Sequence, residues 1–423
     1  MRSQNKSSRQ LPPLLFTMFW VAQAVSLFGD RLNNFSLVAL INRFASKPGL
    51  TLSKVYLAMY LPVFALAPVI GVLLDRLNKR WVLVVTDLLR GTLVFFIPLL
   101  FIRTGSFFPV LAVVFLLAIG NLFFLPAKSG LIPELVPGDR LIRVNSILWT
   151  AGIVGLIGGF LGGGFIFDYL SWPACFYVDG LTYLLSAVLL TGIAVHGRKK
   201  RSDAVKENVK RPSLFAAIRE GLIEIRRAPA IIFPLGIQAL IFFGAGGFSV
   251  LAIVLIKEAS PSGSSLGLSV AGLSIGLGMG LGSLLTHRLY VATTRQKQTE
   301  YLLLFCLVPS TAVVASGWGF LAIGVGTFMT GLVTSPLFII SESDLQRVIA
   351  SDVRGRVFSF REILTRSLFL ISAFSFTILG ELLGKDILLF LLGLFLATTG
   401  VIWIRLSPGT YDGHETTMKT TGG

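Results

Sequence analysis

Apolar residues form twelve continuous stretches along the 423-residue chain, separated by short polar segments. Each stretch holds about 18 to 28 residues, enough for an α-helix to cross the ~30 Å hydrocarbon core of a bilayer. Continuous rather than alternating apolar residues favour helices over barrel strands. The expected spans are 14–42, 55–74, 82–103, 107–125, 147–168, 173–195, 231–256, 266–286, 300–317, 319–341, 363–383 and 386–406. The pattern therefore predicts an all-α membrane protein with twelve transmembrane helices.

Composition supports this prediction, because hydrophobic residues make up 54% of the chain and charged residues only 14%. Mean hydropathy is +0.79, whereas a soluble domain carries about 25% charged residues. The first stretch follows three basic residues and contains Ala-Gln-Ala at 22–24, as a signal peptide could. Since the apolar run continues well past that point, we expect a retained first helix.

The distribution of basic residues gives an orientation. With the N-terminus inside, six of the 37 Lys and Arg fall in external loops, two in helices and the other 29 on the cytoplasmic side. This asymmetry follows the positive-inside rule, so the net charge of +16 is a topology signal and does not indicate nucleic-acid binding. We expect a multi-pass protein of the cell (inner) membrane, with both termini cytoplasmic.

The longest polar stretch, 196–230, divides the chain into two halves. Its second part has apolar residues at helical spacing and is expected to form an amphipathic helix on the membrane surface. A solvated linker touching anionic lipid head groups is the simplest interpretation. The predicted domains are an N-terminal six-helix bundle (1–195), a basic linker (196–230), a C-terminal six-helix bundle (231–406) and a cytoplasmic tail (407–423).

The two halves also resemble each other in sequence. "VPGDRLIRVNS" at 136–146 aligns without gaps on "IASDVRGRVFS" at 349–359, with Asp, Arg, Val and Ser matching at an offset of 213. "GVLLDR" at 71–76 aligns on "GSLLTH" at 282–287 at an offset of 211. Two matches at nearly one offset indicate a parallel repeat about an axis along the membrane normal.

The loop "GVLLDRLNKR", 71–80, resembles the signature between the second and third helices of the major facilitator superfamily, although Asn78 stands where that signature usually has Gly. The runs 123–147, 176–187 and 354–359 are similar to the branch that holds macrolide-efflux proteins, siderophore exporters and lysophospholipid transporters. This resemblance implies two six-helix bundles related by a pseudo-twofold axis along the membrane normal. It defines the substrate poorly, because this fold serves many substrate classes.

The signature loop is expected to act as a cytoplasmic gate. Asp75 lies at the end of an inward-running helix, where the helix dipole disfavours another anion unless a cation faces it. The neighbours of Arg76, or the basic start of the eleventh span, which includes Arg361, could supply that cation; the alternative is a purely topological basic loop. Asp87 and Arg90 can pair at i,i+3, either structurally or within the gate. The candidate gate residues are Gly71, Asp75, Arg76, Lys79, Arg80, Asp87, Arg90, Arg354 and Arg356.

A polar cluster in the first span, "GDRLNN", is costly in hydrocarbon and suggests a cavity. Gln23, Asp30 and Asn34 share one helical face, and Arg31 reaches Asn34 at i+3. We expect them to line a central cavity, with Asp30 as a proton acceptor; the alternative is an Asp–Arg or Asp–Asn bond that packs the helix. Asp179 is a further cavity candidate near the outer end of the sixth span, where it could also be merely solvated.

Glycines in the fifth span predict close helix packing, because they remove side chains along one face. In place of the Pro of the antiporter signature there is a Gly, so the pattern does not establish an antiporter. The residues concerned are Gly155, Gly158, Gly159, Gly162 and Gly163.

The leading functional hypothesis is a proton-coupled secondary transporter that exports hydrophobic or amphipathic molecules by alternating access. Macrolide-like drugs come first as cargo, then lysophospholipids, then siderophores. A membrane-embedded lipid enzyme is disfavoured, because all three His are expected in loops or the tail; a receptor or scaffold would leave the gate loop without a purpose. Expected partners are an amphipathic small molecule or lipid, protons and membrane lipids, with no nucleic acid, no cofactor, no metal and no oligomer beyond the monomer.

Overall fold

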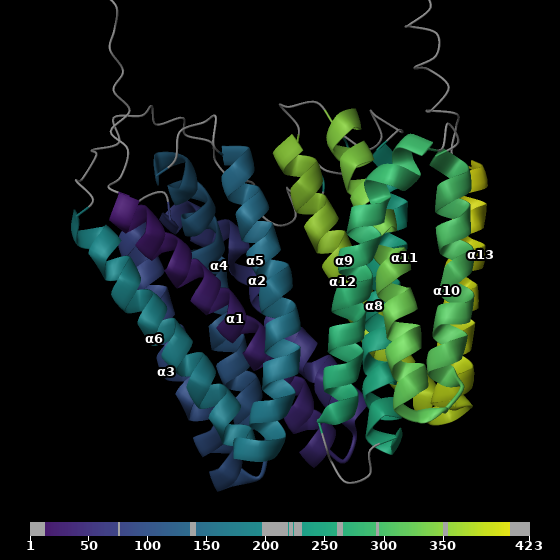
Figure 1. Cartoon of the computed structure of the whole chain (residues 1–423), viewed down its shortest axis with the longest axis horizontal. Helices are drawn as coiled ribbons and strands as arrows, with labels where there is room; N and C mark the ends of the chain where they lie inside the picture. Colours follow the sequence, from purple (N-terminus) through teal and green to yellow (C-terminus); the bar gives the residue numbers. More distant parts are fainter. Residues whose placement is uncertain are drawn as a thin grey trace, which may run out of the picture. The chain divides into compact units, whose positions relative to one another are not determined.

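The structure, a computed structural model, describes residues 13–74, 77–135, 141–196, 231–259, 265–292, 296–349 and 354–406, together with Arg219 and Ile223. Within these residues the chain is helical throughout, with short connections (Figure 1). The expected amphipathic helix of the linker lies outside the described residues, apart from those two isolated positions.

The helices follow the predicted spans in number and order. The first six are α1 (Pro13–Phe44), α2 (Pro48–Leu74), α3 (Lys79–Thr104), α4 (Phe107–Leu135), α5 (Leu141–Phe165) and α6 (Trp172–His196). A π-helical turn, η2 (Ile166–Leu170), extends α5. The other six are α8 (Ile232–Ala259), α9 (Leu266–Ala292), α10 (Gln296–Ala315), α11 (Gly319–Val348), α12 (Arg354–Leu383) and α13 (Lys385–Leu406).

Most helices are longer than the apolar runs that predicted them. Within the described residues, nine are long and apolar enough to cross a membrane by length and composition. α1, which carries the polar cluster, is not among these nine, and α5 and α10 retain only shorter apolar segments. An apolar run marks the part of a helix inside hydrocarbon, whereas its hydrogen-bonded backbone continues into the polar region beyond.

The chain forms two compact units. The first comprises Met1–Ala45, Lys54–Ser213 and Ser264–Ser269, and the second comprises Ser46–Ser53, Leu214–Gly263 and Val270–Gly423. The first turns of α2 therefore belong to the second unit, and the first residues of α9 belong to the first unit. The sequence did not suggest this exchange of helix starts.

Four helix pairs recur in the two units. In the first unit α1 packs on α5 and α6, and α3 packs on α4 and α6. In the second unit α8 packs on α12 and α13, and α10 packs on α11 and α13. Figure 1 lets the reader follow α3 beside α6 and α10 beside α13. The helix pairing therefore repeats, as the sequence offset of 213 suggested.

The glycine face of α5 is where α1 approaches. A Cβ added to Gly159 would lie 2.6 Å from the Arg31 Cβ, and one added to Gly163 would lie 2.5 Å from the Phe35 ring. Gly155 faces the Leu27 carbonyl at 3.5 Å. Gly158 and Gly162 face the Phe28 ring at 3.4 and 3.9 Å, so an added Cβ at these two positions, as at Gly155, would make only an ordinary van der Waals contact. Close approach of α1 and α5 therefore depends on Gly159 and Gly163.

Candidate functional site

A buried ion pair lies at the centre of the first unit. Asp87 and Arg90, one turn apart on α3, form a salt bridge, with side chains 0% and 1% exposed. The Ser186 hydroxyl on α6 donates to the other Asp87 carboxylate oxygen at 2.6 Å. The i,i+3 pairing expected from the sequence is present. Since both charges are removed from water, each depends on the other and on neighbouring polar groups.

The Arg90 guanidinium is enclosed by helices α4 and α6. Its Nη1 donates to the Asn121 side-chain oxygen at 2.7 Å. Its carbon lies 4.0 Å from the Phe124 ring centre and 4.6 Å from the Tyr183 ring centre. Gly120 makes room for the Arg90 stem, because a Cβ there would lie 3.0 Å from Arg90 Cγ. Aromatic faces stabilise a cation that has lost its water, so α3, α4 and α6 together hold this charge.

Asp30 of α1 joins this arrangement through Tyr183. The Tyr183 hydroxyl donates a hydrogen bond to Asp30 Oδ1. Tyr183 is buried, whereas Asp30 is half-buried. Asp30 also interacts electrostatically with Arg90 and Asp87. Asp30 is thus a partly exposed carboxylate connected, through one buried tyrosine, to a fully buried ion pair.

Asp179 lies in the same region, and the alternative of a merely solvated acid is wrong. Its side chain is 0% exposed, because it packs on the first helix at Gly29. A Cβ at Gly29 would lie 2.4 Å from Asp179 Oδ1 and 1.9 Å from the Thr182 hydroxyl. The Thr182 hydroxyl donates to Asp179 Oδ1 at 3.4 Å, while Asp179 Oδ2 has no hydrogen-bond partner. The glycine before Asp30 therefore allows a second carboxylate to approach α1.

The charges of this cluster do not balance. Lys128 on α4 is half-buried and interacts electrostatically with Asp30, Asp87 and Arg90. Within the described part of the chain, the cluster then holds three carboxylates (Asp30, Asp87 and Asp179) and two cations (Arg90 and Lys128). The acids of the cluster therefore outnumber its bases by one.

The other residues of the predicted cavity stripe are placed differently from one another. Asn34 is half-buried, like Asp30. Gln23 is only 1% exposed and its side-chain nitrogen has no hydrogen-bond partner, so it does not share their partial exposure. Arg31 is half-buried and its Nε has no hydrogen-bond partner. Its stem packs against Gly159, on the α5 side of the helix.

Four of the nine predicted gate residues cannot be described. Asp75 and Arg76 are not described, and the same holds for the side chains of Arg354 and Arg356 in the first turn of α12. Gly71 lies in the last turn of α2, and α3 begins at Lys79. The Asn78 side chain caps α3 by accepting from the Arg80 backbone N–H at 3.1 Å. Asn78, the departure from the family signature, thus has a local structural role.

A second polar network occurs in the second unit. Glu342 on α11 accepts from the Gln238 side chain of α8 at 2.9 Å and from the guanidinium of Arg361 on α12. Arg361 is 16% exposed, and its guanidinium carbon lies 4.8 Å from the Phe358 ring centre. The Arg361 considered as a partner for Asp75 is therefore already paired with Glu342.

Sequence reasoning missed Asn121, Tyr183 and Ser186, although α6 carries a signal that could have found two of them. Asp179, Thr182, Tyr183 and Ser186 follow one another at i, i+3, i+4 and i+7, which is a polar stripe on one helical face. Asn121 has only apolar or glycine neighbours over several residues on each side in α4, so it belongs to no polar stripe. Only the packing of α3 against α4 brings it to Arg90.

The chain is similar to transporters in both sequence and fold. It is 25% identical over 398 residues to the uncharacterized MFS-type transporter YfiS of Bacillus subtilis, covering 90% of each chain. It is 24% identical to BacE of the same species, named as a proposed bacilysin exporter, covering 70% of this chain and 71% of that one. It is 22% identical to macrolide efflux protein A of Streptococcus pyogenes, covering 64% and 66%.

Solved structures agree on the fold. The nucleoside transporter NupG matches with a TM-score of 0.63 at 12% identity, covering 92% of this chain and 100% of that one. A bacterial homologue of the iron transporter ferroportin, in an inward-facing state, matches with a TM-score of 0.65 at 18% identity, covering 93% and 100%. The model of the Major Facilitator Superfamily matches residues 19–373. The chain therefore belongs to the Major Facilitator Superfamily and is a multi-pass membrane transporter, not an enzyme.

Proposed function

We propose that this transporter exports hydrophobic or amphipathic small molecules, macrolide-like drugs first among them, in exchange for protons taken up by Asp30. The observation that carries the proposal is the hydrogen bond from buried Tyr183 to half-buried Asp30, beside the Asp87–Arg90 pair. An ionisable group within a membrane helix is costly and marks an ion or substrate pathway by default.

The charge count supports a proton as the coupling ion. With three acids and two bases, the cluster would carry one negative charge if all five groups were ionised, and uptake of one proton would neutralise it. Asp30 is the half-buried member of the three, whereas Asp87 and Asp179 are both 0% exposed. Exchange with water therefore favours Asp30 as the site where the proton enters.

Protonation of Asp30 would change its contacts on two helices. A neutral carboxyl is a weaker acceptor for the Tyr183 hydroxyl than a carboxylate. It also no longer attracts Arg90, which would then depend on Asp87, Asn121 and its two aromatic neighbours alone. Because α1, α3 and α6 all contribute to this network, a proton can bias the packing of the whole first unit.

The cargo class is argued from the apolar character of the chain and from its relatives. With 34 Phe and only 14% charged residues, the protein offers apolar surface rather than the polar contacts that sugars or nucleotides need. Efflux appears in the names of macrolide efflux protein A and, as an exporter, BacE. Lysophospholipids are the second candidate cargo and siderophores the third. We place the protein in the bacterial inner membrane with both termini cytoplasmic.

The test is transport by purified protein in vesicles with an imposed pH gradient. A labelled macrolide, a lysophospholipid and an iron chelator are compared, and we expect the macrolide to move against its gradient. Asp30→Asn keeps the shape and hydrogen bonding of Asp30 but cannot bind a proton. We expect it to lower gradient-driven flux at least tenfold while macrolide binding stays within about twofold.

Asn34→Asp serves as the matched control, because it adds an acid one turn away without restoring Asp30. It should not rescue Asp30→Asn if the position beside Tyr183 matters. Proton-driven flux that survives in Asp30→Asn would remove Asp30 from the mechanism. If only the lysophospholipid is transported and its transport still requires Asp30, the cargo is the lysophospholipid and not the macrolide. The proposed proton site would then stand.

A further inference from the structure

The helix starts that are exchanged between the units are each held by an acid at the end of a helix. In the first unit, the Asp168 carboxylate of η2 accepts from the Ser265 backbone N–H at 3.1 and 3.2 Å and from its hydroxyl at 3.0 Å. Ser265 directly precedes α9. In the second unit, Glu381 near the end of α12 binds the Lys47 ammonium at 3.0 Å, and Lys47 directly precedes α2.

The two acids are equivalent in the sequence repeat. Asp168 and Glu381 are separated by 213 residues, the offset that aligns 136–146 with 349–359. One turn before each acid, the helix meets a serine of the anchored segment. The Ser265 hydroxyl oxygen lies 3.3 Å from the Gly164 carbonyl oxygen, and the Ser53 hydroxyl lies 3.1 Å from the Thr377 hydroxyl. Gly164 and Thr377 are again separated by 213 residues.

The same anchor therefore occurs twice, but its chemistry differs. Ser265 is 2% exposed and presents a backbone donor at a helix N-terminus, where a carboxylate is favoured by the dipole and acts as a rigid cap. Lys47 and Glu381 are two flexible side chains, 61% and 53% exposed. Exposed ion pairs of this kind are weak and screened by salt.

We propose that Asp168 and Glu381 are repeat-equivalent anchors for the first residues of α9 and α2, of which the Glu381–Lys47 anchor releases readily and the Asp168–Ser265 anchor persists. The α2 anchor, called the latch below, is thus the contact that opens, and the α9 anchor is the contact that stays closed. The two anchors lie outside the family signature and outside the cluster around Asp30. Their roles are the same whatever the cargo or the coupling ion.

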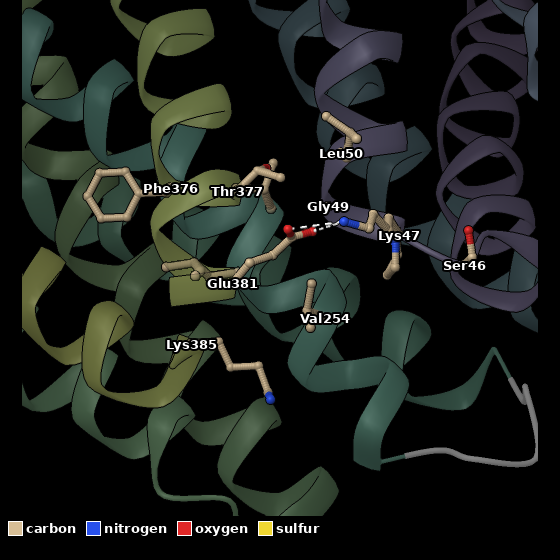
Figure 2. A pocket seen from close by; sticks show the side chains of 13 residues that line it. Ser46, Lys47, Gly49, Leu50, Val254, Phe376, Thr377, Glu381 and Lys385 are labelled. Atoms are coloured by element: carbon tan, nitrogen blue, oxygen red, sulfur yellow. Dashed lines mark hydrogen bonds and ion pairs between the residues drawn. The ribbon is translucent and has the colours of Figure 1, made fainter. Parts of the chain in front are cut away.

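The surroundings of Glu381 allow the latch to be observed. A pocket of about 210 Å³ lies beside the ion pair, within the second unit, and half-buried Val254 of α8 lines it. Figure 2 shows the Glu381 carboxylate directed at Lys47, with Val254 below them. Lys385 also lines the pocket, but it pairs with Glu258 at 2.6 Å. Glu258 is thus a control acid at the same edge, outside the anchor.

The experiment measures how fast a water-soluble maleimide labels Val254→Cys in purified full-length protein, with Cys175→Ala and Cys306→Ala removing the native thiols. Glu381→Gln should raise the rate about two- to fivefold, the range that loss of an exposed ion pair allows. Glu258→Gln should leave the rate unchanged. At a salt concentration of about 1 M, charges are screened beyond ~3 Å. This salt should raise the labelling rate of Val254→Cys when Glu381 is intact, and should not raise it further when Glu381→Gln is present.

Ser269→Cys reports the other anchor, because Ser269 is 9% exposed and lies against Gly164. Its labelling should be insensitive to salt and should rise with Asp168→Asn. The charge swap Lys47→Glu with Glu381→Lys should restore slow labelling of Val254→Cys. Equal effects of Glu258→Gln and Glu381→Gln would overturn the latch, as would salt-insensitive labelling of Val254→Cys. Salt-sensitive labelling of Ser269→Cys would overturn the difference between the anchors.

Discussion

At the scale of single residues, the buried charges of the first unit are stabilised by contacts with several helices. Arg90 meets Asp87, Asn121 and two aromatic rings, so that no single contact carries the cost of desolvation. A buried ion pair is costly to form and far more costly to break by removing one partner. The cluster is therefore a place where a single substitution has a large effect.

Arg90→Gln should be strongly destabilising, because it leaves the Asp87 carboxylate buried without its cation. We expect a loss of about 3–5 kcal/mol, measured as a fall in the thermal unfolding temperature in detergent. Asp87→Asn alone should cost a similar amount. The double variant Asp87→Asn with Arg90→Gln should be more stable than either single variant. Losses that simply add would show that the two charges do not interact.

At the scale of elements, α5 shows how a glycine-rich helix selects its neighbour. Gly159 and Gly163 face α1 closely, whereas Gly152 has nothing within 4 Å of an added Cβ. In the sequence, the glycines that contact α1 and Gly152 look alike, because all are small residues in one apolar run. Their different surroundings arise only when α1 packs on one side of the helix.

Gly159→Ala should destabilise the first unit. The new Cβ would lie 2.9 Å from the Arg31 backbone carbon, which cannot move as a flexible side chain could. Overpacking of this kind costs about 1–3 kcal/mol, again read from thermal unfolding. Gly152→Ala is the matched control, and it should be neutral or slightly stabilising because Ala favours a helix. If both variants behave alike, close packing of α1 on α5 is not what Gly159 provides.

At the scale of the whole molecule, the basic residues and the apolar spans jointly predict a topology that cysteine labelling of intact cells can test. Ser106→Cys lies at an exposed position between α3 and α4, a connection predicted to be external. Ser202→Cys lies in the basic linker, predicted to be cytoplasmic. An impermeant maleimide should label the first in intact cells and the second only after permeabilisation. The reverse pattern would invert the proposed orientation.

Much of the helical framework could be predicted from the sequence, because each span is a continuous apolar run whose length is set by the bilayer. The candidate site could be predicted only in part. Asp30 and the Asp87–Arg90 pair stand out as charges in apolar runs, and i,i+3 spacing on α3 makes the pairing a local matter. Tyr183 and Asn121 are ordinary residues within a helix, and nothing local assigns them a partner.

The sequence by itself determined the class of protein, the number and order of its helices and its internal repeat. The first two follow from the apolar runs, and the repeat follows from the similarity of two short segments. Tertiary structure alone decided which helix each buried polar group meets and which unit holds each exchanged helix start. Asp30 meets Tyr183 across 153 positions, and Asp168 meets Ser265 across 97. Such contacts depend on how helices pack, and packing depends on the shapes of many side chains at once.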